Sequence, residues 1–345
     1  MEAPGANLDE WKPTVDSLDG RHMIHVYGES GTGKSYVIMN MLAVLQRYIP
    51  QIMVFSPTNE QNHVYDRNGE VPSVFIHSKV DADVLNRMWE RQEVMRIAYD
   101  RANKLEVIRR LALRTGEPMY LKYYEQVGKG VDAYIASGGT ATGPAPGTTL
   151  TTEVVISTFV RISKAVIAQH RDSLLKQNLT EDEQKTIKRL AFNPRMLLIF
   201  DDCTDQLKRE KSDIMEKLFY QGRHNLITTI IACHSDKTFT PELKKQTFLT
   251  IFTAPGSAMA YFERASTCLD KAEKLQARRV AGEAFTSKKP NQKLVIDRVS
   301  KKYHKYTAEA GTVVFGSPEI RDYSEKIKRS EDEALRNNAF ADKFR

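Results

Sequence analysis

Short, mainly apolar runs recur along the chain and stop at glycine, proline or acidic residues. Runs of this kind, too short for helices and rich in branched and aromatic side chains, are typical of buried strands. They predict strands at 23–27, 51–55, 73–77, 196–200, 227–232 and 248–252. The run at 196–200 (MLLIF) has no polar interruption, as expected for a strand that is covered on both faces of a parallel sheet.

Between these runs, apolar residues recur at helical spacing. A helix is predicted over 34–47, and residues 80–124 are expected to be mostly helical. Thr180 and Glu183 match a capping box, which predicts a helix from there to about residue 190. Because strands and helices alternate, we predict an α/β fold with a central, mostly parallel β-sheet flanked by helices.

The 345 residues suffice for one large domain or two modest ones. We predict one domain over 21–320, preceded by an irregular lead-in over 1–20 and followed by a charged tail over 321–345 that is helical or frayed. Residues 137–152 (SGGTATGPAPGTTLTT) are rich in glycine, threonine and proline. They are therefore expected to form a flexible insertion within the domain.

Hydrophobic residues make up 41% of the chain, which is ordinary for a globular protein. No apolar run is long enough to suggest a membrane span, and the N-terminus lacks the pattern of a secretory signal. The three cysteines, Cys203, Cys233 and Cys268, show no metal-ligand spacing. We expect a reduced intracellular compartment, with neither zinc nor disulfides.

The formal net charge is +7 and the pI is about 9.1. Eleven lysines and arginines lie between Lys271 and Lys305, opposed only by Glu273, Glu283 and Asp297. We call residues 271–305 the basic segment. A polyanionic partner such as nucleic acid is one interpretation of it, and a solvated surface is the other.

The strand predicted at 23–27 leads into GESGTGKS, which fits the P-loop pattern of glycine, four residues and Gly-Lys-Ser/Thr. Glycines let the backbone turn so that N–H groups point at phosphate oxygens, and the helix that follows adds its positive dipole end. Lys34 is expected to neutralise phosphate charge and the Ser35 hydroxyl to ligate Mg²⁺. The predicted ATP-binding residues are Gly28, Glu29, Ser30, Gly31, Thr32, Gly33, Lys34 and Ser35.

Hydrolysis also needs a carboxylate for Mg²⁺ and a base that orients water. Asp201 and Asp202 follow the MLLIF run directly. Asp201 is predicted to lie in the Mg²⁺ shell, directly or through water, and Asp202 to polarise the attacking water. The alternative is that both aspartates only cap a turn. In P-loop enzymes, an acid after the Walker B aspartate goes with a strand inserted between the P-loop strand and the Walker B strand. This arrangement is typical of motor-like ATPases rather than simple nucleotide kinases.

Two further positions are candidates for catalytic roles. His234 follows the strand predicted at 227–232, so its side chain is expected to face the γ-phosphate as a sensor. Arg223 precedes the same strand and could act across a subunit interface as an arginine finger. The alternatives are a surface histidine and a structural or solvent-facing arginine.

Five segments occur in a fixed order: GESGTGKS, VFSPTNEQNHVY, MLLIFDDC, QGRHNLITTIIACHSDK and FLTIFTAPGS, with QKLVIDRVSKKYHKY further on. Together they resemble the genome-packaging ATPases of large double-stranded DNA viruses, the poxvirus-type branch of the FtsK/HerA superfamily. The match covers roughly 22–60 and 194–256, and residues 60–190 add no motif to it.

The resemblance implies a RecA-like P-loop NTPase core, an oligomeric ring and ATP-driven translocation of duplex DNA into a preformed capsid. It also implies capsid or portal-vertex proteins as partners and the virion or virus assembly site as the location. The positions that match the Walker A pair, the Walker B pair and the family arginine are Lys34, Ser35, Asp201, Asp202 and Arg223. The family's sensor strand usually ends in glutamine, whereas here the nearest polar residue is His234.

A DNA-packaging motor is therefore the leading hypothesis, with the basic segment as the source of its DNA contacts. Another nucleic-acid-dependent P-loop ATPase, such as a helicase or recombination factor, is the main alternative. A small-molecule kinase would need an arginine-rich lid over the phosphates, and the sequence has no clear one. A non-enzymatic nucleotide-binding scaffold would behave the same after Asp202→Asn.

Overall fold

The computed structural model describes residues 8–18, 22–67, 70–141, 143, 151–209, 213–235, 237, 239–264, 271–286 and 291–342. The chain divides into two compact units. The first, which we call the sheet unit, comprises Met1–Gln92 and Pro194–Arg345. The second, the helical unit, comprises Glu93–Asn193.

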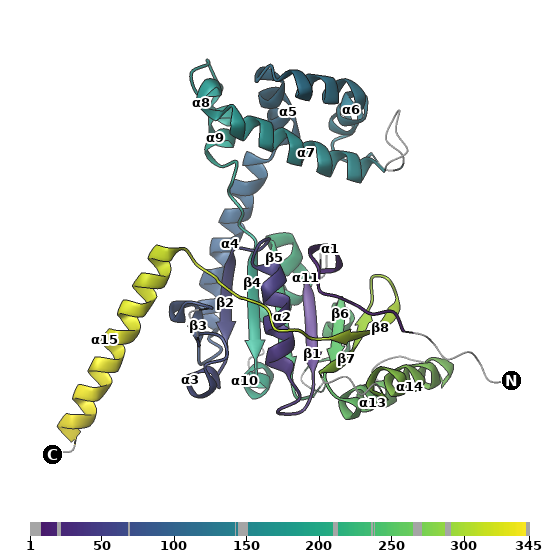
Figure 1. Cartoon of the computed structure of the whole chain (residues 1–345), viewed down its shortest axis with the longest axis vertical. Helices are drawn as coiled ribbons and strands as arrows, with labels where there is room; N and C mark the ends of the chain where they lie inside the picture. The colour runs from purple at the N-terminus through teal and green to yellow at the C-terminus, as the bar shows by residue number, and fades with distance from the viewer. Residues whose placement is uncertain are drawn as a thin grey trace. The chain divides into compact units, whose positions relative to one another are not determined.

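The described part of the sheet unit contains one eight-stranded sheet in the order β3-β2-β4-β5-β1-β6-β7-β8 (Figure 1). The strands are β1 Met23–Tyr27, β2 Gln51–Phe55, β3 Ile76–His77, β4 Met196–Asp201, β5 Ile227–Cys233, β6 Leu249–Phe252, β7 Gln292–Asp297 and β8 Lys302–Thr307. Pairings from β3 to β6 are parallel, and those of β6 with β7 and β7 with β8 are antiparallel. The predicted α/β fold with a mostly parallel sheet flanked by helices is confirmed.

Strand β5 lies between β1 and β4 and pairs in parallel with both. Tyr27 at the end of β1 is opposite Cys233, and Asp201 at the end of β4 is opposite Ala232. The extra strand expected beside the P-loop strand is therefore present. Because these strands are parallel, their last residues meet at one edge, which we call the carboxyl edge. The opposite edge is the amino edge.

Alternate strand residues face two separate cores, as the period of two in a strand requires. On one face, Ile24 and Val26 of β1 belong to a buried cluster with Leu42 of helix α2 (Lys34–Leu45). On the other face, Tyr27 belongs to a cluster with Phe262 of α13 (Pro255–Glu263). Cover on both faces explains why these strands read as nearly continuous apolar runs.

The helical unit has a hydrophobic core of its own, which includes Ile108, Leu111, Phe159 and Ile167. Its helices are α5 Leu105–Arg114, α6 Pro118–Ala136, α7 Thr152–Gln169, α8 Arg171–Leu174 and α9 Glu181–Lys188, and α4 Ala82–Ala102 runs across the unit boundary. The sequence predicted one domain over 21–320 and gave no sign of this core. Helical spacing shows that a face is apolar, but it does not show which helices share a core.

The capping box at the start of α9 is confirmed. The Thr180 Oγ1 accepts a hydrogen bond from the Glu183 N–H at 3.3 Å, and the Glu183 carboxylate accepts one from the Thr180 N–H at 2.8 Å. Residues 142 and 144–150 of the predicted insertion lie outside the described residues. No helix in the described ranges is long and apolar enough to cross a membrane.

The strand predicted at 73–77 is largely wrong. Residues Ser73–Phe75 form a 3₁₀ turn, η1, and only Ile76–His77 pair with β2 as β3. Pro72 precedes the turn, and Phe75 donates its N–H to the Pro72 carbonyl instead of to a neighbouring strand. An apolar run of this length does not distinguish a strand from another buried segment.

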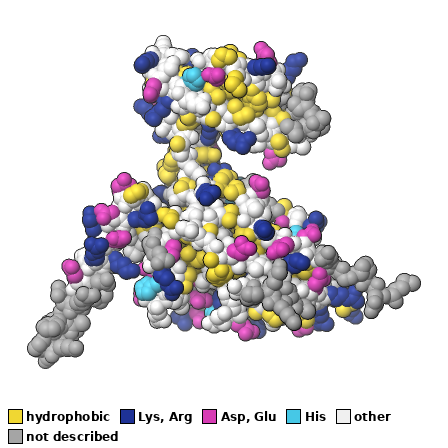
Figure 2. All heavy atoms as spheres, viewed as in Figure 1, with side chains coloured by type: hydrophobic (Ala, Val, Ile, Leu, Met, Phe, Trp, Pro, Cys, Tyr) yellow, Lys and Arg dark blue, Asp and Glu magenta, His cyan; other side chains and the backbone are white. Residues whose placement is uncertain are grey.

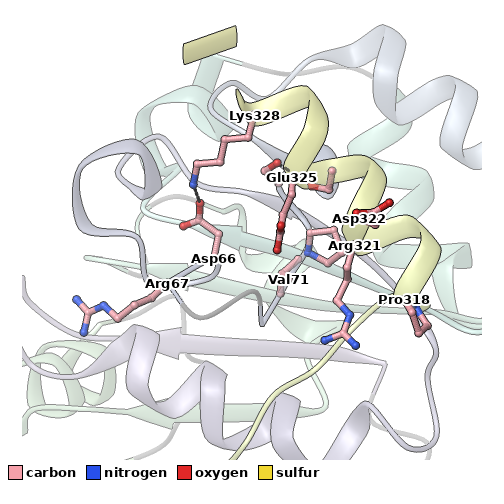
Figure 3. A pocket seen from close by; sticks show the side chains of 11 residues that line it. Asp66, Arg67, Val71, Pro318, Arg321, Asp322, Glu325 and Lys328 are labelled. Atoms are coloured by element: carbon pink, nitrogen blue, oxygen red, sulfur yellow. Dashed lines mark hydrogen bonds and ion pairs between the residues drawn. The ribbon is translucent and has the colours of Figure 1, made fainter. Parts of the chain in front are cut away.

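Both predicted chain ends are attached to the sheet unit. In the lead-in, the Trp11 N–H donates to the carbonyl of Lys305 in β8, and α1 covers Val15–Leu18. The predicted tail is a helix, α15 Pro318–Asp342, and its Lys328 pairs with Asp66 at 2.8 Å. A cavity of about 560 Å³ lies between α15 and the segment that carries Asp66 (Figure 3).

The remaining elements connect the strands. They are α3 Asn59–Asn62, α10 Thr204–Arg209, α11 Asp213–Gln221, η2 Gly222–Asn225, α12 Pro241–Lys245 and α14 Lys271–Thr286. Helices α10, α3 and α13 begin just after β4, β2 and β6, at the carboxyl edge, whereas η2 and α12 lead into β5 and β6 at the amino edge.

Candidate active site

The P-loop leaves β1 at the carboxyl edge and opens directly into α2. Gly33, just before the helix, has φ +86°, a left-handed conformation that favours glycine. At Gly28, a β-carbon would lie 1.8 Å from the Thr253 Oγ1, so only glycine fits there. The sequence pattern thus has a steric cause at both ends of the loop.

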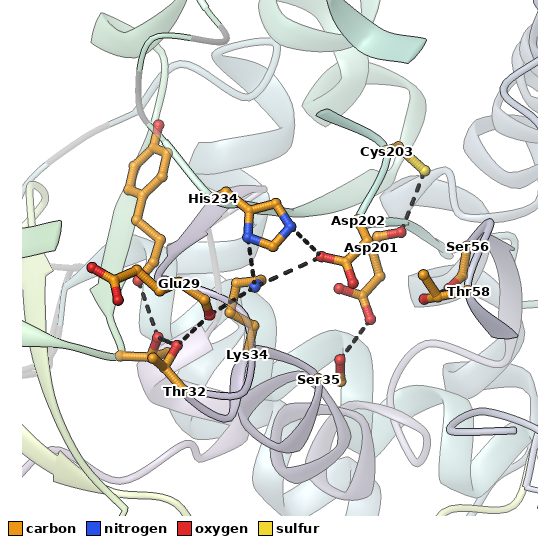
Figure 4. Close-up of polar contacts among 12 residues, drawn as sticks. Glu29, Thr32, Lys34, Ser35, Ser56, Thr58, Asp201, Asp202, Cys203 and His234 are labelled. Carbon is orange, nitrogen blue, oxygen red and sulfur yellow. Dashed lines mark hydrogen bonds and ion pairs between the residues drawn. The ribbon is translucent and has the colours of Figure 1, made fainter. Parts of the chain in front are cut away.

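The Lys34 side chain lies in the centre of the site and is 5% exposed (Figure 4). Its Nζ donates to the Glu29 carbonyl at 3.1 Å, within the same loop. It also lies 3.7 Å from the Asp202 carboxylate and 3.4 Å from the His234 Nδ1. A lysine at this position can neutralise phosphate charge with little rearrangement.

Asp201 ends β4 and is 2% exposed. Its Oδ2 accepts hydrogen bonds from the Ser35 Oγ and from the Tyr65 hydroxyl, both at 2.8 Å. Burial raises the pKa of Asp201, the charge of Asp202 acts in the same direction, and the bonds from Ser35 and Tyr65 oppose the rise. The carboxylate is thus oriented by two donors in surroundings that disfavour its charge.

The other oxygen of Asp201, Oδ1, is buried and has no hydrogen-bond partner among the described residues. A buried polar atom without a partner is costly unless a ligand satisfies it. Mg²⁺ prefers oxygen ligands such as carboxylates and hydroxyls, and the Ser35 hydroxyl is hydrogen-bonded to the Asp201 carboxylate. The donor set at Ser35 and Asp201 therefore fits Mg²⁺, directly or through water.

Asp202 has φ +56°, which is uncommon for a residue other than glycine. Strained backbone of this kind costs on the order of 1–3 kcal/mol and clusters at functional sites. The turn places the Asp202 side chain, 26% exposed, 3.2 Å from the His234 Nε2. Asp202 is thus more accessible than Asp201, as a group that contacts water needs to be.

His234 directly follows β5 and bridges Lys34 and Asp202, because its Nδ1 contacts the Lys34 ammonium group and its Nε2 contacts the Asp202 carboxylate (Figure 4). The ring is 44% exposed. The structure therefore brings together Lys34, Ser35, Asp201, Asp202 and His234, which are separated by up to 200 residues in the chain. The sensor role of His234 stays a prediction.

Arg223 does not join this group. It lies in η2, at the amino edge, where its Nε is 3.3 Å from the His224 Nε2. The seven residues of β5 separate it from the carboxyl edge, which corresponds to roughly 20 Å at about 3.3 Å per residue. Within one chain, Arg223 therefore cannot reach phosphates bound at the P-loop.

Three residues of the site were missed by the sequence analysis. Tyr65 is fully buried, and burial raises its pKa well above the ordinary value, so that it remains a hydrogen-bond donor to Asp201. Thr253, just after β6, places its Oγ1 2.5 Å from the Thr32 Oγ1. Lys293 of β7 donates to the Thr32 carbonyl at 2.7 Å. All three lie in segments quoted above, Tyr65 in VFSPTNEQNHVY, Thr253 in FLTIFTAPGS and Lys293 in QKLVIDRVSKKYHKY, but the sequence analysis assigned none of them a role in the site.

The basic segment is divided by the fold. Lys293 is buried at the P-loop, whereas Lys271, Arg278 and Arg279 are exposed on α14. Figure 2 shows dark-blue side chains gathered at the lower right, over α14. Lys301 and Lys302 are exposed at the turn between β7 and β8. Lys288 and Lys289 lie outside the described residues.

No protein-family model matches the chain. The uncharacterized protein B354L of African swine fever virus (isolate Pig/Kenya/KEN-50/1950) is 28% identical over 338 residues, which cover 93% of this chain and 92% of that protein. Protein 075L of Invertebrate iridescent virus 6 is 35% identical over 83 residues, 24% of this chain and 31% of that protein. The chain is thus similar to viral proteins, in the first case over nearly its whole length.

Solved structures that resemble the chain include the genome-packaging NTPase B204 of Sulfolobus turreted icosahedral virus 2 in complex with ATP-gammaS. It is 12% identical, with a TM-score of 0.38 and coverage of 87% of this chain and 100% of that one. The plasmid coupling protein TrwB is 10% identical, with a TM-score of 0.39 and coverage of 92% of each chain.

Proposed function

We propose that this chain is an ATP-hydrolysing motor that translocates double-stranded viral DNA into a preformed capsid. One observation carries the hydrolytic part of the proposal. The Ser35 hydroxyl donates a hydrogen bond to the buried Asp201, one Asp201 oxygen has no partner in the described part of the chain, and Asp202 lies next to them with a more exposed side chain. This separation of a metal carboxylate from a water-facing carboxylate is what hydrolysis requires and what nucleotide binding alone does not.

The residues divide the chemistry among them. Mg²⁺ held at Ser35 and Asp201 would neutralise charge that develops on the phosphates. Backbone N–H groups of the P-loop and Lys34 bind and orient the phosphates of ATP. Asp202 orients a water molecule and takes its proton. The contacts of His234 with both Asp202 and Lys34 support a role in sensing whether the γ-phosphate is present.

The position of Arg223 supports a ring. Because it lies at the amino edge, away from the P-loop of its own chain, it can act as an arginine finger only on the nucleotide of a neighbouring subunit. A finger in trans makes hydrolysis depend on assembly, and a closed ring of identical subunits repeats the same interface.

Exposed lysines and arginines on α14 and at the β7–β8 turn supply the proposed DNA contacts. Contacts of this kind to phosphate do not depend on sequence and weaken with salt. A packaging motor needs such contacts because it must move along any sequence of its genome.

The viral setting is supported by the similarity to B354L over 93% of the chain. We propose capsid or portal-vertex proteins as partners, and the virion or virus assembly site in the host cell as the location. Cosedimentation of the purified protein with assembled capsids or with portal-vertex protein tests this part of the proposal.

The first test is steady-state ATP hydrolysis with and without long duplex DNA, at low and moderate salt, with Lys34→Ala as the blank. We expect stimulation by duplex DNA of any sequence that fades as salt rises. A triplex-displacement assay then separates movement along an intact duplex from strand separation, which a helicase would show. ATP turnover that is indifferent to DNA would contradict the motor proposal.

The trans arrangement has its own test. Arg223→Ala protein should bind ATP but hydrolyse it on the order of 10³-fold more slowly. Mixing it with Asp202→Asn protein forms interfaces that have an intact Asp202 on one side and Arg223 on the other, so some turnover should return. An absence of recovery at every mixing ratio would refute a finger in trans.

A further inference from the structure

Lys293 contacts the P-loop, although it is 258 residues beyond Ser35 in the sequence. It is the second residue of β7, and its side chain is 3% exposed. Its Nζ donates to the Thr32 carbonyl at 2.7 Å and lies 3.4 Å from where a β-carbon on Gly33 would be. Thr32 is thereby held at two points, because its hydroxyl also contacts Thr253.

The contact with the Thr32 carbonyl fixes more than that oxygen. In a trans peptide, the C=O and the N–H of one peptide unit point in opposite directions. Because the Thr32 carbonyl points at the Lys293 ammonium group, the Gly33 N–H of the same peptide unit points away from Lys293. A carbonyl that accepts a hydrogen bond from a charged donor also polarises its own peptide and strengthens the N–H as a donor.

The charge of Lys293 is not compensated by the fold. Among the described residues, no carboxylate forms an ion pair with it, and its hydrogen bond goes to the Thr32 carbonyl. Burial lowers the pKa of Lys293 because the charged form loses its hydration. Placing a lysine here is therefore unfavourable for the folded protein alone, whereas a leucine or methionine would avoid the cost.

An anion at the P-loop would remove this disadvantage. Lys34 and Lys293 approach the same loop from α2 and from β7, and both are buried. Lys34 already has the Glu29 carbonyl, Asp202 and His234 as partners. Since no carboxylate among the described residues pairs with Lys293, a bound anion would balance its charge.

We propose that Lys293 is a positioning residue of the phosphate site. It holds the Thr32–Gly33 peptide with its N–H directed into the loop, and it adds a second positive charge that a bound polyphosphate compensates. This inference rests on the proposed function in that it takes the P-loop to bind nucleotide. It assigns to phosphate binding one lysine of the basic segment that the sequence alone would give to DNA.

The test compares Lys293→Met with wild-type protein in two measurements, the affinity for ADP by titration calorimetry and the melting temperature of the nucleotide-free protein. Methionine keeps most of the side-chain length and removes the charge. We expect the ADP dissociation constant to rise on the order of 10- to 100-fold. The melting temperature without nucleotide should stay the same or rise, because an uncompensated buried charge is gone.

A purely structural link between β7 and the P-loop predicts the opposite pattern, with a lower melting temperature and an ADP affinity within twofold of wild type. That pattern would overturn the inference. Lys293→Gln keeps a neutral donor for the Thr32 carbonyl, so an intermediate affinity is expected, and it replaces Lys293→Met if that variant does not fold. An affinity of Lys293→Gln equal to wild type would show that the charge is not needed.

Lys244→Met is the matched control. Lys244 is also a buried lysine whose pKa is lowered by burial, but it lies on α12, at the amino edge away from the P-loop. Its replacement should leave ADP affinity unchanged.

Lys34→Ala separates this inference from the proposed function. If wild type binds ADP, Lys34→Ala does not, and Lys293→Met binds like wild type, only the role of Lys293 is refuted. If wild type does not bind ADP, both fail.

Discussion

Replacing Tyr65 by phenylalanine tests whether the buried Tyr65 hydroxyl, which donates to Asp201, orients this carboxylate for metal binding. The change removes one oxygen atom and keeps the aromatic ring, which is fully buried. Asp201 would then lose one of its two donors to Oδ2 and retain only Ser35, itself a proposed metal ligand. The carboxylate would be both less well oriented and less favoured in its charged form.

The size of the effect follows from the kind of bond that is lost. A hydrogen bond to a charged group contributes about 1.5–3 kcal/mol, and loss of a group that orients a metal ligand typically weakens metal affinity about 10- to 100-fold. We therefore expect the Mg²⁺ concentration for half-maximal ATP hydrolysis to rise about 10- to 100-fold in Tyr65→Phe. The maximal rate at saturating Mg²⁺ should fall much less, because Asp202 and Lys34 are untouched.

The assay is ATP hydrolysis as a function of free Mg²⁺, accompanied by thermal unfolding. Tyr120→Phe is the control, since the Tyr120 hydroxyl is also buried and forms a 2.7 Å hydrogen bond with Ser163, but within the helical unit. Tyr120→Phe should lose about 0.5–1.5 kcal/mol of stability and Tyr65→Phe about 1.5–3 kcal/mol, because only the partner of Tyr65 is charged. Only Tyr65→Phe should change the Mg²⁺ dependence. A half-saturating Mg²⁺ concentration within twofold of wild type would refute the assigned role of Tyr65.

Three further predictions concern other parts of the molecule. Asp202→Asn should bind ATP as wild type does and lose hydrolysis by about 10²- to 10⁴-fold, the usual contribution of a general base; hydrolysis near the wild-type rate would exclude Asp202 as the base. Trp11→Ala should cost about 3–5 kcal/mol in urea unfolding, because the buried indole packs edge-on against Tyr306 at 5.0 Å; a cost below about 1 kcal/mol would mean that the lead-in is dispensable. Burial tends to raise the pKa of Glu183, but hydrogen bonds, first from Thr180, hold this pKa below its ordinary value. The ionised carboxylate therefore stabilises the fold above about pH 4.3, and this contribution is lost as the pH falls through the lower pKa of the folded protein. Glu183→Gln should therefore be less stable at pH 7 and show a flatter fall in stability between about pH 5 and pH 3, and a fall as steep as that of wild type would contradict this assignment.

Local sequence patterns determined strands β1, β2, β4, β5 and β6, the P-loop and the two aspartates. Each of these features is contiguous, so its physical requirement is written in neighbouring residues. The MLLIF run of β4 is apolar at every position because both faces of the strand are buried, and the aspartates follow where the strand meets the carboxyl edge. Gly28 and Gly33 are fixed by close approach and by backbone conformation, which explains why the motif could be recognised without a structure.

Only the tertiary structure decided which distant residues complete the site. Tyr65 and Lys293 each contact it through a single side-chain bond, and no local pattern marks such a bond. The sequence grouped Lys293 with a basic segment by its charge, whereas burial in β7 separates it from that segment. The same holds for Arg223, because the direction of β5 places it at the amino edge and thereby requires a neighbouring subunit for its proposed role. Patterns along a chain specify how each segment folds, but strand order and burial specify which segments meet, and these depend on the whole sheet.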